Sequence, residues 1–460
     1  MSELLDEIKN VVGDNGLITG DEVHQRSGDW RGVTRCRAKA IVRPASTREV
    51  SKVVEICNRQ SQPLVAAGGL TGLVHGVDAG PDEIMLSFER MTAIENIDAV
   101  GRTMTVQAGA PLEKVQNAAR DAGLHYAVDL GARGSATIGG NISTNAGGNQ
   151  VLRYGMTREQ VLGLEAVLAD GTVISSMNRL LKNNSGYDLK QLFIGTEGTL
   201  GIVTRAVLKL APQPHQPRTA FLACDSFEAV ARNFSTLGES YGPSLTSFEV
   251  MWDNYYDLIV AKSDRHQAPV PHGHKFYIIV EANLDDEARF AGALETNIDS
   301  GLIADAAIAQ SGPQRDAMWA IRDDIIGLMM AMLPGAVFDV SLPITEMAAY
   351  AEDVSTKVSS TFGEGARTVI FGHIGDGNLH IVISAPEWDE TKIRQSEEIV
   401  YAPLSAIGGA ISAEHGVGLE KREYLKLSRS GDEIALMRRL KAALDPAGIL
   451  NPGKVFTAKS

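Results

Sequence analysis

Two long glycine-rich loops in the first third of the chain constrain its fold more than any other feature of the sequence. One covers residues 66–72 and follows the apolar pair Leu64-Val65, and the other covers residues 131–141 and continues into residues 145–149. Glycine tolerates positive φ angles and lets backbone N–H groups approach a ligand closely, which suits a pyrophosphate. One loop of this kind is more often a tight turn. The two loops together favour a dinucleotide-binding site.

Short strands and a helix surround the first loop in the order that is typical of an α/β segment. Ile41-Val42 predicts a strand, and the capping-box pattern at residues 46–49 begins a helix whose apolar residues recur at helical spacing through Cys57. A second strand then leads into the loop. The chain has neither the GxGxxG motif nor the GxxxxGK[ST] motif, so the Rossmann fingerprint and the P-loop are absent.

The composition and pattern of the sequence change at the proline-rich segment 211–217, which predicts a domain boundary. From about residue 218 to 425 the glycine density falls and strands alternate with longer helices, as in an α+β domain. The last turns of the chain lie near residues 445–454. The predicted domains are residues 1–215, 216–425 and 426–460.

Composition and charge narrow the class of protein. The length of 460 residues and the hydrophobic content of 44% suit two or three domains with packed cores. A formal net charge of -14 argues against a nucleic-acid partner, but it allows a small anionic substrate that a few local cations could bind. Three scattered cysteines form neither a disulfide framework nor a metal-binding pair. With no secretory signal and no membrane-spanning run in the sequence, we expect a cytoplasmic protein.

A histidine-bearing hairpin is the sharpest local signal of the second domain. Strand-like runs at residues 368–374 and 379–384 flank a short turn segment. If Asp376-Gly377 forms a two-residue turn, His373 faces His380 across the hairpin, with Cβ atoms about 5 Å apart. Two imidazoles so placed can share one metal ion. A turn shifted by one residue would break this pairing. For either histidine taken alone, the simpler interpretation is a cross-strand pair satisfied by hydrogen bonds, without a metal.

The segment 412–418 offers a carboxylate and a third imidazole. Glu414 would complete a His₂Glu set with open positions for a substrate, as in catalytic zinc sites, and His415 could act as a base. Neighbouring side chains on an extended strand point to opposite faces, so the two can serve one pocket only if the backbone kinks. Gly416 and Gly418 allow such a kink. Taken alone, Glu414 is more simply an exposed or capping carboxylate.

Together these segments resemble the FAD-binding oxidoreductases of the vanillyl-alcohol-oxidase type, in particular the branch of D-2-hydroxyglutarate and D-lactate dehydrogenases. The segments that carry the resemblance are 65–76, 129–148, 152–155, 184–191, 195–201, 372–380, 412–418 and 451–454. They cover nearly the whole chain. The resemblance implies an α+β fold, in which a two-subdomain FAD-binding domain carries an α+β cap domain with an antiparallel sheet. The C-terminal segment is expected to return to the FAD domain.

The resemblance also implies that FAD binds without a covalent bond. A histidine often occupies the first loop of relatives that attach FAD covalently, and this chain has Leu70 there and no cysteine in the second loop. The pyrophosphate is expected against residues 68–72 and 134–140. The expected cofactor-binding residues are Ala67, Gly68, Gly69, Leu70, Thr71, Gly72, Leu130, Gly134, Ser135, Thr137, Ile138, Gly140, Asn145, Gly147, Gly148, Glu197, Gly198, Ile202 and Asn451.

By the same resemblance, His373, His380 and Glu414 are the metal ligands and His415 is the catalytic base. Imidazole and carboxylate ligands accept several divalent ions, and we expect Zn²⁺ before Mn²⁺. The implied reaction converts a D-2-hydroxy acid into the 2-oxo acid, with hydride passing to flavin N5. The electrons would continue to another carrier, which could be a flavoprotein, a quinone or a cytochrome.

Arg322 matches the arginine with which the family binds the substrate carboxylate. A planar guanidinium can donate two parallel hydrogen bonds to the acid group that all 2-hydroxy acids share. The residues alone support a second interpretation equally well. In that interpretation Arg322 is a surface arginine of a helix, paired with Asp323 or Asp324.

Three positions depart from the members of the branch that act on 2-hydroxyglutarate. Val337 stands where those members tend to have a lysine, and Ile326 and Val382 are also more apolar than their counterparts. A second buried carboxylate would need a partner that this chain does not offer there. We expect these three residues, with Arg322 and His415, to bind a substrate whose tail is smaller or more apolar than that of 2-hydroxyglutarate.

Two other functions are compatible with parts of the sequence. A hydrolase with zinc-bound hydroxide would use the histidines and Glu414, but it would leave the glycine-rich loops without a role. A non-catalytic flavin-binding protein would bind FAD that no 2-hydroxy acid can reduce. The sequence leaves open whether the protein forms a homodimer.

Overall fold

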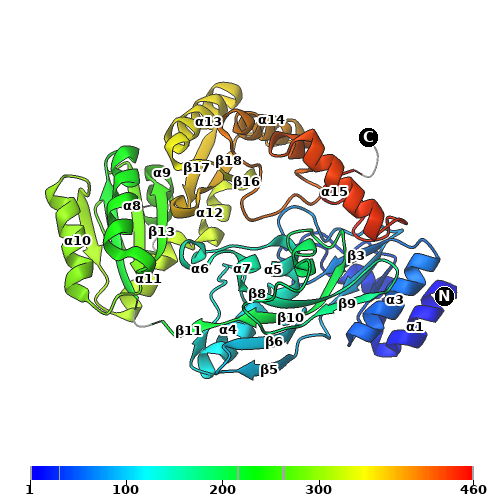
Figure 1. Ribbon diagram of the computed structural model, residues 1–460. Coiled ribbons are helices and arrows are strands. Elements are labelled where there is room, and N and C mark those ends of the chain that lie inside the picture. The colour runs from blue at the N-terminus through cyan, green and yellow to red at the C-terminus, as the bar shows by residue number, and fades with distance from the viewer. Residues whose placement is uncertain (1–2, 31, 215–216, 262–264, 458–460) are drawn as a thin grey trace. The chain divides into compact units, whose positions relative to one another are not determined.

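The computed structural model describes residues 3–30, 32–214, 217–261 and 265–457, which fold into two compact units (Figure 1). The first unit takes the described residues up to Gly148, then Tyr154–Gln213, and the chain again from Glu414 onward. The second unit takes Asn149–Arg153 and the described part of Pro214–Ala413. The predicted boundary between residues 215 and 216 lies outside the described residues, and the chain re-enters the first unit at Glu414 rather than near residue 426.

The first unit contains a four-stranded and a five-stranded sheet. The smaller sheet has the order β1 (Leu17–Thr19), β2 (Ala40–Val42), β4 (Ile84–Ser87) and β3 (Leu64–Ala67), and β2, β4 and β3 are parallel. The larger, antiparallel sheet has the order β5 (Ile94–Asp98), β6 (Thr103–Gln107), β10 (Ile202–Lys209), β8 (Val161–Val167) and β9 (Val173–Ser176). A short pair joins β7 (Leu124–His125) to β11 (Ala211–Pro212).

Several helices pack with these sheets, and the two glycine-rich loops join the two kinds of element. The helices of this unit are α1 (Glu3–Val12), α2 (Asp21–Gln25), α3 (Thr47–Arg59), α4 (Leu112–Asp121), α5 (Ile138–Thr144), α7 (Thr157–Gln160) and α15 (Gly431–Leu444). α3 begins where the capping pattern predicts, because Ser46 Oγ accepts a hydrogen bond from the backbone N–H of Glu49. The first loop follows β3 directly, and the second ends where α5 begins.

The second unit is built on one seven-stranded antiparallel sheet. Its order is β15 (Asp305–Ile308), β12 (Arg218–Cys224), β14 (Phe276–Ala282), β13 (Leu245–Trp252), β17 (Arg367–Gly372), β18 (Asn378–Ser384) and β16 (Gly335–Ser341). Its helices are α8 (Phe227–Tyr241), α9 (Asp253–Tyr256), α10 (Glu287–Asp299), α11 (Gly312–Arg322), α12 (Ile325–Met332), α13 (Met347–Phe362) and α14 (Glu390–Tyr401). The chain changes unit at the short helix α6 (Val151–Tyr154).

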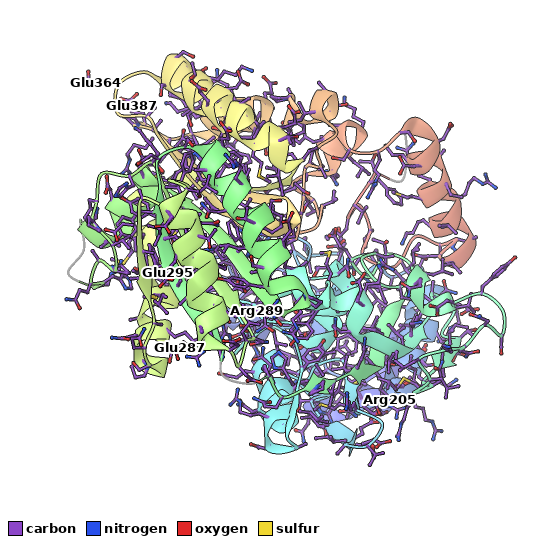
Figure 2. The ribbon with its side chains drawn as sticks, turned by 60° about the vertical axis from the view of Figure 1, so that its left-hand side comes forward. Arg205, Glu287, Arg289, Glu295, Glu364 and Glu387 are labelled. Carbon is purple, nitrogen blue, oxygen red and sulfur yellow. The ribbon has the colours of Figure 1, made fainter. Side chains whose placement is uncertain are left out.

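Helices cover both faces of this sheet. α8 packs on β13 and β14, with α10 beside it, and α13 packs on β17 (Figure 1). Figure 2 labels Glu287, Arg289 and Glu295 on α10, where Arg289 Nε donates to the carbonyl oxygen of Ser240 on α8 (3.0 Å). The helices α9, α11 and α12 enclose a separate apolar core with the sheet, and this core includes Phe371 and Val382.

The architecture confirms the predicted α+β fold with an antiparallel sheet in the second part of the chain. Within the described residues, none of the helices combines the length and the apolarity that crossing a bilayer requires.

Candidate active site

The two glycine-rich loops of the first unit approach each other so closely that side chains at Gly68 and Gly69 would not fit. A Cβ atom on Gly68 would lie 2.4 Å from Thr137 Oγ1, and a Cβ atom on Gly69 would lie 1.8 Å from the carbonyl oxygen of Ser135. Thr137 also caps α5, where its Oγ1 accepts a hydrogen bond from the N–H of Gly140 (3.3 Å). The loops therefore form a cradle of backbone groups that suits a pyrophosphate.

Asn451 holds the first loop of this cradle from the C-terminal end of the chain. Its Oδ1 accepts a hydrogen bond from the N–H of Ala66 (2.8 Å), and its Nδ2 donates to the carbonyl oxygen of Glu197 (2.5 Å). Gly198 has a φ of 71°, and a Cβ atom there would lie 2.9 Å from Asn451 Nδ2. The structure thus brings Asn451 to Glu197 and Gly198, from which it is widely separated in the sequence.

The other predicted cofactor-binding residues lie on the same loops or in the elements that follow them. Leu70 adopts a φ of 56° within the first loop, and Asn145 ends α5 in a left-handed conformation. Among the remaining members, Ala67 ends β3, Ile138 starts α5 and Ile202 starts β10. The others lie on or directly beside the two loops: Thr71, Gly72, Leu130, Gly134, Gly147 and Gly148.

The chain kinks where it re-enters the first unit. Gly416 and Gly418 have φ angles of 87° and 52°, which confirms the predicted kink after His415. Glu197 fixes this turn by accepting hydrogen bonds from the N–H groups of Val417 (2.7 Å) and Gly418 (2.8 Å). Burial raises the pKa of Glu197 above its usual value, although these two N–H donors oppose the shift.

Glu414, the predicted carboxylate ligand, lies against the second glycine-rich loop. Its Oε1 accepts a hydrogen bond from the N–H of Gly148 (2.5 Å), which has a φ of 104°. A Cβ atom at Gly148 would lie 1.9 Å from the carbonyl oxygen of Asp129, so only glycine fits beside it. The contact fixes the residue that immediately precedes the predicted base, His415.

A buried network in the second unit joins Arg322 to His373 through a carboxylate. Arg322 ends α11 and is only 4% exposed, and its Nε donates to Glu249 Oε2 (3.0 Å). The other oxygen of Glu249 lies 2.8 Å from His373 Nδ1, and Arg322 Nη2 lies 3.2 Å from His373 Nε2. The Arg322 guanidinium also stacks over the ring of Phe371, at 4.9 Å from its centroid.

Glu249 and Arg322 keep each other ionised despite their burial. Burial alone would raise the pKa of Glu249, but His373 and Arg322 outweigh burial and hold this pKa below its usual value. Burial would likewise lower the pKa of Arg322, and Glu249 reverses that effect and raises it. The interpretation of Arg322 as a surface arginine is therefore wrong, because its partner is a buried carboxylate.

The two histidines of the hairpin come close together, although not in the predicted register. His380 pairs with Phe371 across β17 and β18, and a 3₁₀ turn at Ile374–Asp376 replaces the predicted two-residue turn. His373 therefore belongs to the connection and not to the strand. Its ring centroid still lies 5.3 Å from that of His380, and a nitrogen of each ring lies within 4.8 Å of the other. Such a pair can provide two ligands of one metal ion.

Asp339 is a second buried carboxylate beside the histidines. It faces His380 across β16 and β18, and its Oδ1 lies 3.8 Å from His380 Nδ1. It accepts hydrogen bonds from Asn378 Nδ2 (2.8 Å) and from the N–H of Ala413 (3.0 Å). Asp339 therefore fixes the chain just before Glu414.

The three apolar positions predicted to contact the substrate differ in their exposure. Ile326 on α12 is 74% exposed, Val337 is partly buried, and Val382 is fully buried in the core beneath α12. Val337 and Val382 are direct cross-strand partners. They occupy the sheet face that carries His380 and Asp339, because side chains two residues apart on a strand share a face.

Sequence reasoning did not identify Glu249 or assign a role to Asp339. Each is the single charged residue of its strand, and both are almost completely buried. A charged residue inside a buried strand needs a partner. This pattern is the signal that could have identified both residues as members of a polar network. The sequence could not indicate which cation each would meet.

Comparison with known families covers most of the chain. Residues 38–176 match the family described as "FAD binding domain", and residues 213–455 match "FAD linked oxidases, C-terminal domain". The chain is 41% identical over 436 residues to D-2-hydroxyglutarate dehydrogenase of Xanthomonas citri pv. viticola, covering 93% of this chain and 91% of that protein. It is 36% identical to D-2-hydroxyglutarate dehydrogenase of Stutzerimonas stutzeri, covering 99% of each chain.

Solved structures show the same fold at much lower sequence identity. p-Cresol methylhydroxylase has a TM-score of 0.78 at 14% identity, with 99% of this chain and 96% of that chain covered. 4-Ethylphenol oxidase from Gulosibacter chungangensis has a TM-score of 0.74 at 18% identity, with 98% and 96% covered. Both are flavoenzymes of the vanillyl-alcohol-oxidase type. The chain therefore belongs to the FAD-linked oxidase family, among the D-2-hydroxyglutarate dehydrogenases, and it is an FAD-dependent oxidoreductase.

Proposed function

We propose that the protein oxidises a D-2-hydroxy acid to the corresponding 2-oxo acid. The buried Arg322–Glu249–His373 network carries this proposal, because it combines a cation for a carboxylate with an imidazole for a metal. The names of the relatives support the same class of substrate. FAD, when bound, supplies the hydride acceptor that no protein side chain can provide. The predicted cofactor-binding residues and the glycine-rich cradle would hold it.

Arg322 is proposed to bind the carboxylate of the substrate. Its Nε is engaged by Glu249, which fixes the plane of the guanidinium, and Phe371 packs against one face of it. The two terminal NH₂ groups, Nη1 and Nη2, then form the edge from which a guanidinium donates paired hydrogen bonds to a carboxylate. Burial strengthens such an ion pair, because little water competes for the charges.

His373, His380 and Glu414 are proposed to bind a divalent metal, Zn²⁺ before Mn²⁺. The proximity of the two buried imidazoles supports this, and so does Asp339, which holds the residue before Glu414. A metal bound there would lower the pKa of the substrate hydroxyl as a Lewis acid. His415 is proposed as the base that removes the hydroxyl proton, because an imidazole can exchange a proton near neutral pH.

The sheet face around these residues favours an apolar substrate tail. Val337, Val382 and Val369 form a row across β16, β18 and β17, next to the row of Asp339, His380 and Phe371. Val337 is the partly exposed member of this row, and a carboxylate tail beside it would lose water without gaining a partner. We therefore propose that Val337, Ile326 and Val382 select a tail smaller or more apolar than that of 2-hydroxyglutarate.

Anaerobic titration of the bound flavin with paired D- and L-2-hydroxy acids tests the proposed reaction. A D-acid should bleach the flavin absorption and its L-enantiomer should not. Among the D-acids, those with apolar tails should have a higher kcat/KM than D-2-hydroxyglutarate. If no acid reduces the flavin, the dehydrogenase proposal fails. A clear preference for D-2-hydroxyglutarate would refute only the proposal that the substrate has a smaller or more apolar tail.

Replacing Val337 by lysine should move this preference toward D-2-hydroxyglutarate. A new ammonium would partner the distal carboxylate, and a charged hydrogen bond of this kind corresponds to about a 10-fold gain in the kcat/KM ratio of the two substrate types. Val100→Lys is the matched control. It adds the same charge at a residue of the first unit that is 97% exposed. Equal ratios in both variants would show that position 337 does not contact the tail.

Three further properties stay predictions. The electron acceptor is expected to be another carrier, such as a flavoprotein, a quinone or a cytochrome, and a homodimer remains open. A cytoplasmic location is also expected, whereas the relative from Bos taurus is named as mitochondrial. A metal hydrolase without flavin is not favoured, because two FAD-related families match this chain.

A further inference from the structure

Glu249 lies at the centre of the buried network and has one hydrogen-bond donor on each carboxylate oxygen. It sits on β13 with 1% exposure, next to the strand that leads to His373. Oε1 lies 2.8 Å from His373 Nδ1, and Oε2 accepts from Arg322 Nε at 3.0 Å. One side chain therefore contacts both the proposed metal ligand and the proposed substrate-binding cation.

Contacts with Glu249 and Arg322 bear on which nitrogen of His373 carries the proton. His373 Nδ1 lies 2.8 Å from Glu249 Oε1, a carboxylate oxygen to which a protonated Nδ1 can donate. An arginine can only donate, so His373 Nε2, at 3.2 Å from Arg322 Nη2, must accept. Both contacts therefore select the neutral tautomer with the proton on Nδ1. This tautomer leaves the ring's lone pair on Nε2, through which an imidazole can bind a metal once the hydrogen bond from Arg322 Nη2 is released.

We propose that Glu249 is a positioning residue that fixes His373 in the Nδ1-protonated tautomer and holds Arg322 beside it. The inference rests on the proposed function, because it assigns His373 to a metal and Arg322 to a carboxylate. A carboxylate behind a ligating imidazole orients the ring and increases its basicity. A single carboxylate that contacts both groups also fixes the spacing between the proposed metal ligand and the proposed carboxylate-binding cation.

A second buried glutamate in the same sheet provides a matched control. Glu281 lies on β14, the neighbour of β13, and accepts from Arg315 Nε (2.7 Å) and Arg315 Nη2 (3.1 Å). Arg315 belongs to α11, as Arg322 does. Glu281 also accepts from Trp319 Nε1 (2.9 Å) and from Thr219 Oγ1 (2.7 Å), and no histidine is among the partners recorded for it in the described residues. It reproduces a buried glutamate paired with an arginine, although Arg315 is 32% exposed, without the link to a proposed metal ligand.

Zinc binding to the flavin-loaded protein, stripped of metal, tests the proposal without using activity. The amide of Glu249→Gln has one acceptor and one donor group, so it cannot accept from both His373 and Arg322. Removal of such an outer partner typically lowers metal affinity by about 10- to 100-fold. Competition with a chromophoric chelator should show this loss in Glu249→Gln and wild-type affinity in Glu281→Gln, with thermal unfolding recorded for each variant.

The outcomes separate this inference from the proposed function. If the wild-type protein binds zinc tightly and Glu249→Gln binds it equally well, Glu249 does not position His373, and the metal assignment stands. If both glutamine variants lose affinity together, the effect is a general one of buried ion pairs, and the inference is refuted. If the wild-type protein binds no zinc, the metal assignment and the inference fail together.

Nitrogen NMR of the wild-type protein tests the tautomer even if Glu249→Gln does not fold. With ¹⁵N-labelled histidine, and with the resonance assigned by its loss in His373→Asn, His373 should show a protonated Nδ1 and an unprotonated Nε2. Added zinc should shift the Nε2 resonance. A His373 ring that is protonated on Nε2 would overturn the proposal.

Discussion

At the scale of single residues, the burial and orientation of Arg322 depend on partners that are distant in sequence. The adjacent Asp323 is only a weak partner, since its Oδ1 lies 3.9 Å from Arg322 Nη1. Glu249 is the close one, and it comes from another element of the sheet. A buried guanidinium and a buried carboxylate require each other, because either alone would be an uncompensated charge. Arg322 is thus held in a fixed orientation, as a substrate-binding cation must be.

Replacement of Arg322 by lysine should weaken substrate binding strongly. A lysine ammonium cannot occupy the Nε position beside Glu249 and donate paired hydrogen bonds to a carboxylate at once, so the KM for the preferred D-acid should rise by about 10- to 100-fold. Steady-state kinetics at saturating electron acceptor measures the change. Arg315→Lys, on the same helix, should leave KM near the wild-type value. An unchanged KM in Arg322→Lys would remove Arg322 from the substrate site.

At the scale of elements, the glycine-rich loops and the capped helix α3 were predictable because their signals are local. Glycine at residues 68–69 reports a close approach of backbone, and the structure explains it by the contacts with Ser135 and Thr137. The hairpin register was not predictable from the same kind of signal. The predicted turn at Asp376-Gly377 and the observed 3₁₀ turn at Ile374–Asp376 overlap at Asp376, and only packing decides between them.

The close contact of the two loops makes Gly69 a sensitive position. In Gly69→Ala the new methyl group would meet the carbonyl oxygen of Ser135, so the loops must separate, at a cost of about 1–3 kcal/mol. The purified variant should contain less FAD per chain than the wild type. Gly131→Ala is the control in the second loop, because a Cβ atom there would meet no protein atom within 4 Å. Full FAD content in Gly69→Ala would show that the cradle does not hold the cofactor.

At the scale of the whole molecule, the net charge of -14 says little about the ligand. The protein still holds a buried cation, Arg322, whose ionisation Glu249 supports, so an acidic chain can select an acidic substrate locally. Composition and the proline-rich segment indicated more than one domain, but they did not locate the return of the chain at Glu414. That return depends on backbone hydrogen bonds of Val417 and Gly418 to Glu197, for which the sequence has no local signal.

We propose that a D-2-hydroxy acid reduces the flavin with the help of a metal bound by His373, His380 and Glu414. The most direct measurement is the anaerobic absorption spectrum of the purified protein, titrated with the preferred D-acid before chelation, after chelation and after zinc is restored. The account predicts rapid bleaching of the oxidised flavin, its loss on chelation and its recovery with zinc. Bleaching that chelation leaves unchanged would contradict the metal-assisted mechanism.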